Sequence, residues 1–192
     1  MLILSDGQRL GTISGGCLEG DVARKARWWL AQSAPALRTY DTSSEGAAWE
    51  FGLGCNGVIT VLLEAADDPH VTGLLDYLDT QLRARRGAAV ATIIRAGSGA
   101  SARLGDRIWH DASGTPGGPL AGTATGAALS GPLDKVLGEQ SSRFISLDGL
   151  EVFVEWIGPP QRLVIFGAGH DVIPVVSRSE EHTSELQSPY VI

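Results

Sequence analysis

Short apolar runs alternate along the chain with amphipathic stretches, a pattern typical of strands and helices packed in layers. Runs rich in aliphatic and β-branched residues predict strands at 2–4, 9–14, 37–40, 58–63, 88–95, 108–111 and 150–157. Apolar positions at helical spacing predict helices over about 18–31, 71–86 and 132–137, and the leucines of the second helix are expected in the core. This alternation predicts an α/β fold with mixed sheets, its first unit ending near Ala66 and its second near Ile157.

The division of the chain follows from these elements and from a weak internal repeat. The predicted units are 1–66, 69–157, 161–176 and 177–192. The second unit echoes the first, but its opening strand at 88–95 has no counterpart before Leu2. Because copies of a repeat normally share the same elements, about twenty residues of the first copy are expected to be absent. The alternative is that two ordinary αβ segments resemble each other by chance.

The last two segments differ sharply from each other in composition. Residues 162–166 predict a buried-type strand, and Gly167-Ala168-Gly169 follows it as the start of a phosphate-binding turn. The third glycine of a dinucleotide fingerprint would fall at Val172, so that fingerprint is incomplete. Residues 177–192 are polar, resemble translated adapter sequence, and are expected to be a disordered, non-native tail. We therefore expect a fragment cut at both ends, closing on a truncated Rossmann-like start.

Two glycine-rich turns hold the only two cysteines of the sequence. The first runs from a strand through Gly15-Gly16 to Cys17, where an amphipathic helix is predicted to begin. A helix N-terminus presents free N–H groups and lowers the pKa of a thiol. The second turn, Gly52–Gly57, carries Cys55 at the start of a strand. Both cysteines are expected to face one cleft, the alternative being that each is only a small buried apolar residue.

Composition narrows the class of protein. The 192 residues are 43% hydrophobic, which excludes a disordered chain. A net charge of −7 argues against partners such as nucleic acid and anionic membranes. Two cysteines without a signal peptide indicate the reducing cytoplasm. Four scattered histidines and two distant cysteines offer no metal-ligand spacing to the protein alone.

The two cysteine motifs also carry a family resemblance. Residues Thr12–Glu19 and Gly52–Gly57, in that order, resemble the paired signatures of the xanthine dehydrogenase accessory protein family, the XdhC/CoxI type. Residues Val164–Asp171 resemble the start of the C-terminal dinucleotide-type fold of that family. The resemblance spans roughly Met1 to Val176 and is strongest at these three motifs.

The resemblance implies a protein that binds molybdenum cofactor (molybdopterin) and helps to insert it, in sulfurated form, into a molybdenum hydroxylase such as xanthine dehydrogenase. It implies a carrier or chaperone rather than an enzyme, with Cys17 and Cys55 as contacts to the cofactor's molybdenum or sulfur. A cysteine desulfurase as a second partner and a homodimer as the assembly stay open. From motifs and resemblance together, the residues expected to bind cofactor are Ser14, Gly15, Gly16, Cys17, Glu19, Gly54, Cys55, Asn56, Gly57, Gly167, Gly169 and His170.

Two other functions are kept as alternatives. The glycines at 167 and 169 are compatible with an NAD(P)-linked oxidoreductase, and His170 could hydrogen-bond a phosphate or simply cap the helix. The chain could also be a structural fragment whose motifs are intact but whose pocket is incomplete.

Overall fold

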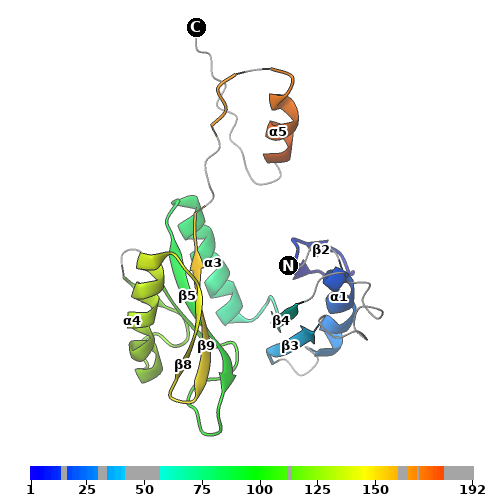
Figure 1. The fold of residues 1–192 in the computed structure, drawn as a ribbon. Coiled ribbons are helices and arrows are strands. Elements are labelled where there is room, and N and C mark those ends of the chain that lie inside the picture. The colour runs from blue at the N-terminus through cyan, green and yellow to red at the C-terminus, as the bar shows by residue number, and fades with distance from the viewer. Residues whose placement is uncertain are drawn as a thin grey trace. The chain divides into compact units, whose positions relative to one another are not determined.

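A computed structural model describes residues 1–13, 17–29, 34–41, 57–111, 114–159, 164–167 and 169–179 (Figure 1). The chain divides into two compact units, Met1–Pro159 and Pro160–Ile192. The first unit holds all the described strands and most of the helices. The predicted α/β class agrees with this content, but every described strand pair is antiparallel, so the prediction of mixed sheets was wrong for these residues. Short hairpins account for the β1–β2 and β8–β9 pairs, while β9 returns antiparallel to β5 only after α4 and β8.

A five-stranded sheet is the centre of the first unit. Its strands, in spatial order, are β7 (Pro116–Gly117), β6 (Arg107–Asp111), β5 (Ala88–Ala96), β9 (Leu150–Ile157) and β8 (Arg143–Leu147). The central strand β5 is buried on both faces from Ala88 to Ala91. The predicted strands at 88–95, 108–111 and 150–157 are confirmed, while β7 and β8 were not predicted. β8 was missed because it is only five residues long and contains just three apolar residues, Phe144, Ile145 and Leu147, between polar ones.

Helix α4 (Ala124–Glu139) covers one face of this sheet and forms the larger core with it. Leu129, Leu133 and Val136 of the helix are fully buried against alternate residues of the central strands. The predicted helix at 132–137 was too short. Thr123 accepts a hydrogen bond from the Gly126 N–H at 3.0 Å and caps the helix well before the start that Pro132 would suggest. A Cβ at Gly126 would lie 2.0 Å from the Leu120 carbonyl oxygen, so glycine is required there.

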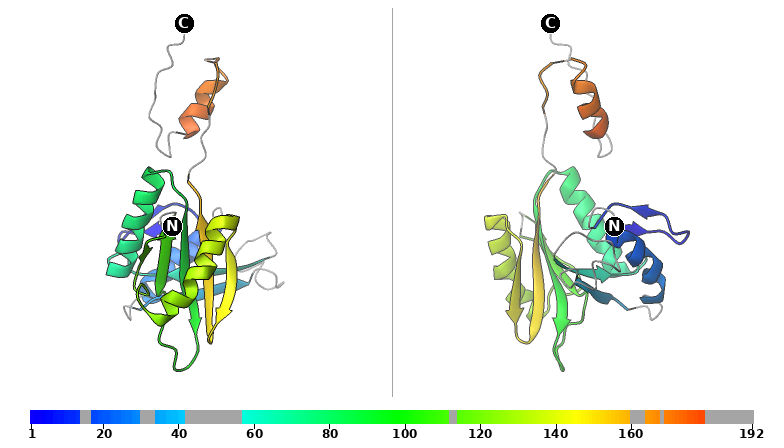
Figure 2. Two further views of the ribbon diagram at one scale, coloured as in Figure 1. Left: turned by 90° about the vertical axis from the view of Figure 1, so that its left-hand side faces the viewer. Right: turned by 45° about the vertical axis from the view of Figure 1, so that its right-hand side comes forward.

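Helix α3 (Pro69–Arg83) lies on the opposite side of the sheet from α4 (Figure 2). Its contact with the sheet is aromatic, because Tyr77 stacks on Trp109 of β6 with ring centroids 5.4 Å apart. Gln81, one turn further, is buried. The prediction that the leucines of this helix form core was wrong for Leu75 and Leu82, which are 53% and 36% exposed. The helix face that meets the sheet carries Tyr77 and Gln81, and it is not the face that carries Leu75 and Leu82.

The N-terminal part of the first unit contains two small antiparallel sheets and one helix. Strand β1 (Leu2–Ile3) pairs with β2 (Arg9–Leu10), and β3 (Ala36–Asp41) pairs with β4 (Val58–Leu63). Helix α1 (Cys17–Trp29) packs on them. These elements confirm the predicted strands and helix, with shorter hairpin strands than expected. Their core consists of Leu18, Val22, Ala26, Ala36, Tyr40 and Leu63.

The second unit is described over few residues. Helix α5 (Val172–Ser179) follows the Gly-rich turn, as predicted for a helix start. The predicted strand is absent from residues 164–166, where Val164 and Phe166 are 65% and 95% exposed. A strand needs neighbours to bury its residues, and none pairs with it among the described residues of this unit. The predicted unpacked tail begins too early, since Ser177 lies in α5, and 180–192 lie outside the described residues.

Candidate functional site

Half of the residues predicted to bind a cofactor lie outside the described part of the chain. They are Ser14, Gly15, Gly16, Gly54, Cys55 and Asn56. The prediction that Cys17 and Cys55 face one cleft therefore stays a prediction.

Cys17 is the first residue of α1, as the sequence predicts. The N-terminus of a helix of 13 residues carries a partial positive charge, which favours an anion or a thiolate nearby. Glu19, in the first turn, is buried, and its Oε1 accepts a hydrogen bond from the Ile13 N–H at 2.8 Å. This bond ties Ile13 to the first turn of the helix. A direct contact of Glu19 to a cofactor stays a prediction.

One helical turn beyond Cys17, a buried carboxylate organises the face of α1 toward β3. Asp21 accepts hydrogen bonds from Arg24, from Lys25 at 2.7 Å and from the Tyr40 hydroxyl at 3.1 Å. Burial alone would raise the pKa of Asp21, but the bonds from Lys25, Arg24 and Tyr40 outweigh it and hold that pKa below its usual value. Burial and the Asp21 charge raise the pKa of Tyr40 to about 12. Asp21 is therefore ionised at neutral pH and fixes α1 against β3.

We expect Asp21→Asn to lower the free energy of unfolding by about 1–3 kcal/mol at pH 7, since charge-assisted bonds to a buried group are lost. The folded pKa is depressed, so the ionised carboxylate contributes fully above the unfolded value of about 4. That contribution is lost as the pH falls through the lower folded pKa. Urea titrations of both proteins should therefore differ at pH 7 and converge toward pH ~2. The exposed pair of Asp79 and Arg83 supplies the control, because Asp79→Asn should change little at either pH. A difference that persists unchanged at low pH would contradict the role of the Asp21 charge.

The remaining predicted site residues lie in separate places. Gly57 immediately precedes β4 and is half-buried. Gly167, Gly169 and His170 belong to the second unit and are exposed. Gly167 has a φ of +138°, a conformation that favours glycine, and the Val172 N–H donates to the Gly169 carbonyl at 3.0 Å as α5 begins. This hydrogen bond and backbone angle are those of an ordinary helix start, and phosphate binding there stays a prediction.

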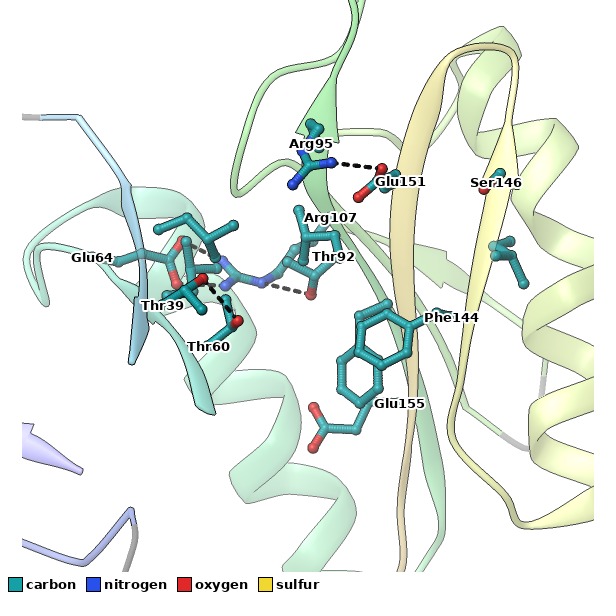
Figure 3. Close-up of a pocket in the computed structure, with 15 residues that line it drawn as sticks. Thr39, Thr60, Glu64, Thr92, Arg95, Arg107, Phe144, Ser146, Glu151 and Glu155 are labelled. Carbon is teal, nitrogen blue, oxygen red and sulfur yellow. Dashed lines mark hydrogen bonds and ion pairs between the residues drawn. The ribbon is translucent and has the colours of Figure 1, made fainter. Parts of the chain in front are cut away.

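The first unit also contains a cavity that the sequence did not predict (Figure 3). It has a volume of about 740 Å³, within the range of small-molecule sites, and lies between the β3–β4 pair and one face of the five-stranded sheet. Arg107 crosses it from β6: Nη1 donates to Glu64 Oε1 at 2.7 Å, Nη2 to Glu64 Oε2, and Nε to Thr92 Oγ1 at 3.2 Å. Arg107 is only 6% exposed, so its ion pair with Glu64 is largely buried. The pair joins the end of β4, which Glu64 follows, to the start of β6.

Other side chains give this cavity both polar and aromatic surfaces. The hydroxyls of Thr39 and Thr60 share a hydrogen bond of 3.0 Å at its edge. Phe144 packs on Phe153 with centroids 4.8 Å apart, yet remains 73% exposed. Burial raises the pKa of Glu155, which Arg107 partly opposes. Such a cavity suits a small flat molecule with hydrogen-bonding edges. Sequence reasoning missed it because its residues come from several strands and share no motif.

The described residues offer neither a metal site nor a membrane span. No group of three or more His, Cys, Asp or Glu side chains that could hold a metal ion occurs among them. Within the same ranges, every helix is too short or too polar to cross a bilayer.

The comparisons with known proteins agree with the cysteine motif. The model of the XdhC and CoxI family matches residues 1–41, which include the Thr12–Glu19 segment, so the resemblance is confirmed. A protein of Bacillus subtilis (strain 168), described as a probable subunit of xanthine dehydrogenase, is 28% identical over 187 residues, covering 92% of this chain and 49% of that protein. A crystal structure from Bacillus halodurans, described as a xanthine dehydrogenase, superposes with a TM-score of 0.62 at 27% identity, covering 93% of this chain and 48% of that one. The chain thus spans about half the length of these relatives.

Proposed function

We propose, from the match of residues 1–41 to the XdhC and CoxI family model and from the similar proteins above, that the protein is an accessory factor for a molybdenum hydroxylase of the xanthine dehydrogenase type. In this role it binds molybdenum cofactor and delivers it in the cytoplasm to the client enzyme. The observation that carries the proposal is the position of Cys17. It is the first residue of α1 and lies within the segment that the family model matches.

The chemistry of this segment fits such a cofactor. The cofactor has an anionic phosphate, which the partial positive charge at the start of α1 would favour. A thiolate at Cys17 is stabilised by the same partial charge and is a soft ligand for molybdenum or sulfur. The hydrogen bond from the Ile13 N–H to Glu19 ties Ile13 to the first turn of α1, close in sequence to Cys17. When bound, the cofactor supplies the redox-active metal centre that the client enzyme uses.

Substitution of the cysteines tests this function. We expect Cys17→Ala and Cys55→Ala to lower the molybdopterin that co-purifies with the protein by about tenfold or more, and Cys17→Ser to do nearly the same. A serine hydroxyl is hard and protonated at neutral pH, so it cannot replace a thiolate. The measurement is oxidative release and fluorescence of the pterin, per mole of protein from cells that make the cofactor.

Thermal midpoints of the same variants provide the control. They should stay close to that of the unsubstituted protein, because cysteine and serine are similar in volume. A cysteine that is only packed in the core would show the reverse, a lowered midpoint with unchanged cofactor. If the double variant Cys17→Ser, Cys55→Ser contained as much molybdopterin per mole as the unsubstituted protein, the proposal would be wrong.

The NAD(P)-linked alternative has less support. The strand that should precede its phosphate-binding turn is not formed at residues 164–166. The Gly167 turn and α5 by themselves are common to many helix starts.

A further inference from the structure

A row of side chains crosses the face of the five-stranded sheet that lines the cavity in Figure 3. The strand registers place its members opposite one another, in the order Arg107, Thr92, Phe153 and Phe144. The two phenylalanines at the β8 end pack together with ring centroids 4.8 Å apart, and Phe144 remains 73% exposed. An exposed aromatic ring in the wall of a cavity can stack on a flat ligand.

A carboxylate lies two residues further along β9. Because side chains alternate along a strand, Glu155 lies on the same face of the sheet as Phe153. Figure 3 shows the Glu155 carboxylate projecting from β9 beside Phe144. It makes no hydrogen bond or ion pair with the described residues. Burial raises the pKa of Glu155 and the charge of Arg107 opposes this only in part, as expected for a carboxylate without a bonding partner.

The other charged groups of the cavity are paired with each other. Arg107 donates to both carboxylate oxygens of Glu64, and Arg95 donates to Glu151 at 2.8 Å. Two arginines and three glutamates belong to the described lining, so the negative charge in excess is that of Glu155. A ligand with N–H donors on its edge suits this carboxylate, whereas an anionic group beside it would be repelled.

The opposite wall of the cavity supplies hydroxyl groups. Thr39 and Thr60 are partners across the β3–β4 ladder, and their hydroxyls share a hydrogen bond of 3.0 Å. This bond uses the proton of one hydroxyl and leaves that of the other able to donate to a carbonyl. Leu37 and Leu62, the neighbouring pair on this face, add apolar surface. The strand expected before Leu2 would pair with the edge of β4 away from β3, so it would lie beside this wall and not over it.

We propose that this cavity binds a flat, fused nitrogen heterocycle that has a ring N–H and an amino group side by side on one edge. Guanine and pterin rings share this edge, together with a carbonyl next to the ring N–H. The ring stacks on Phe144 and donates two parallel N–H bonds to the Glu155 carboxylate. Its carbonyl accepts from the hydroxyls of Thr39 and Thr60. The site needs neither cysteine, and the inference does not rest on the proposed delivery of cofactor.

Guanosine and inosine are a matched pair of probes, because inosine lacks only the amino group of guanosine. We expect guanosine to bind saturably below about 1 mM, and inosine to bind at least about tenfold more weakly, since a hydrogen bond to a carboxylate is lost. Neopterin, which carries the same donor edge on a pteridine ring, is the second probe. Calorimetric titration measures the nucleosides, and fluorescence measures neopterin. Binding of either probe supports the proposal, and the tighter one shows whether the site selects a purine or a pteridine.

Two substitutions in the protein test the assigned contacts. Glu155→Gln should weaken the binding of guanosine by about tenfold to a hundredfold, because an amide has one acceptor oxygen and its NH₂ group opposes the donors of the ligand. Phe144→Leu should weaken it by about twofold to tenfold through the loss of stacking. Both side chains are exposed, so neither variant should unfold more easily in urea. Asp79→Asn in α3, outside the cavity, is the control and should bind guanosine as the unsubstituted protein does.

Three results would overturn the proposal. Neither guanosine nor neopterin binds up to about 1 mM; inosine binds as tightly as guanosine; or Glu155→Gln leaves the affinity for guanosine unchanged. The second and third results would show that the donor edge is not recognised by this carboxylate. The molybdopterin content of the cysteine variants is a separate measurement, so the failure of either proposal leaves the other standing.

Discussion

Replacement of Arg107 by methionine is expected to lower the free energy of unfolding by about 3–5 kcal/mol, because it leaves the Glu64 carboxylate without its partner in a buried site. Arg107 is 6% exposed and donates two parallel bonds to Glu64, with a third to Thr92 at 3.2 Å. Methionine keeps most of the volume of the stem and removes only the donors. Urea unfolding of the purified protein measures the difference.

The double variant Arg107→Met, Glu64→Leu separates a broken pair from a lost contact. With both charges removed, no uncompensated charge is buried, and most of the lost stability should return. Arg95→Met is the matched control, since its pair with Glu151 lies at the exposed edge of the same cavity and should contribute little. A single variant as stable as the unsubstituted protein would show that the cavity admits water to Glu64.

Leu133→Ala is expected to lower the free energy of unfolding by about 2–5 kcal/mol, the range for a buried leucine that leaves a cavity. Leu133 is 0% exposed and lies in α4 against the central strands of the sheet. Its neighbours belong to a helix and a sheet that cannot collapse into the space without moving the register of either.

Leu75→Ala in α3 removes the same atoms from a side chain that is 53% exposed, and should cost less than about 0.5 kcal/mol. Thermal and urea unfolding of both variants provide the comparison. Similar losses at the two positions would mean that the leucine face of α3 is covered in solution.

Much of the first unit could be predicted from the sequence because its strands are short apolar runs between polar turns. Strands β4 and β9 begin and end where the pattern predicts. Periodicity failed where two signals conflicted. Pro132 and the small residues before it concealed the first turns of α4, although Thr123 is a suitable N-cap. The leucines of α3 have a helical period, but the period does not say which stripe meets the sheet, and the stacking of Tyr77 on Trp109 decided it.

The candidate sites also differ in whether the local sequence was enough to predict them. The start of α1 at Cys17 followed from local chemistry, since glycines and a helical pattern lie together in the sequence. The pairing of Arg107 with Glu64 could not be predicted, because 43 residues separate two side chains that only the tertiary fold brings together. The strand predicted before Gly167 failed because burial depends on partner strands that a local pattern cannot supply.

The position of β5 at the centre of its sheet also has a consequence for synthesis of the protein. β5 pairs with β9, whose last residue is made roughly sixty residues later, a delay of several seconds at about 5–20 residues per second on the ribosome. During that interval one edge of an apolar strand has no partner in its own sheet, although β6, the partner of its other edge, has already been made. The nascent β5 therefore presents an open apolar edge until β9 has been made, and correct folding requires that no other strand pairs with this edge first.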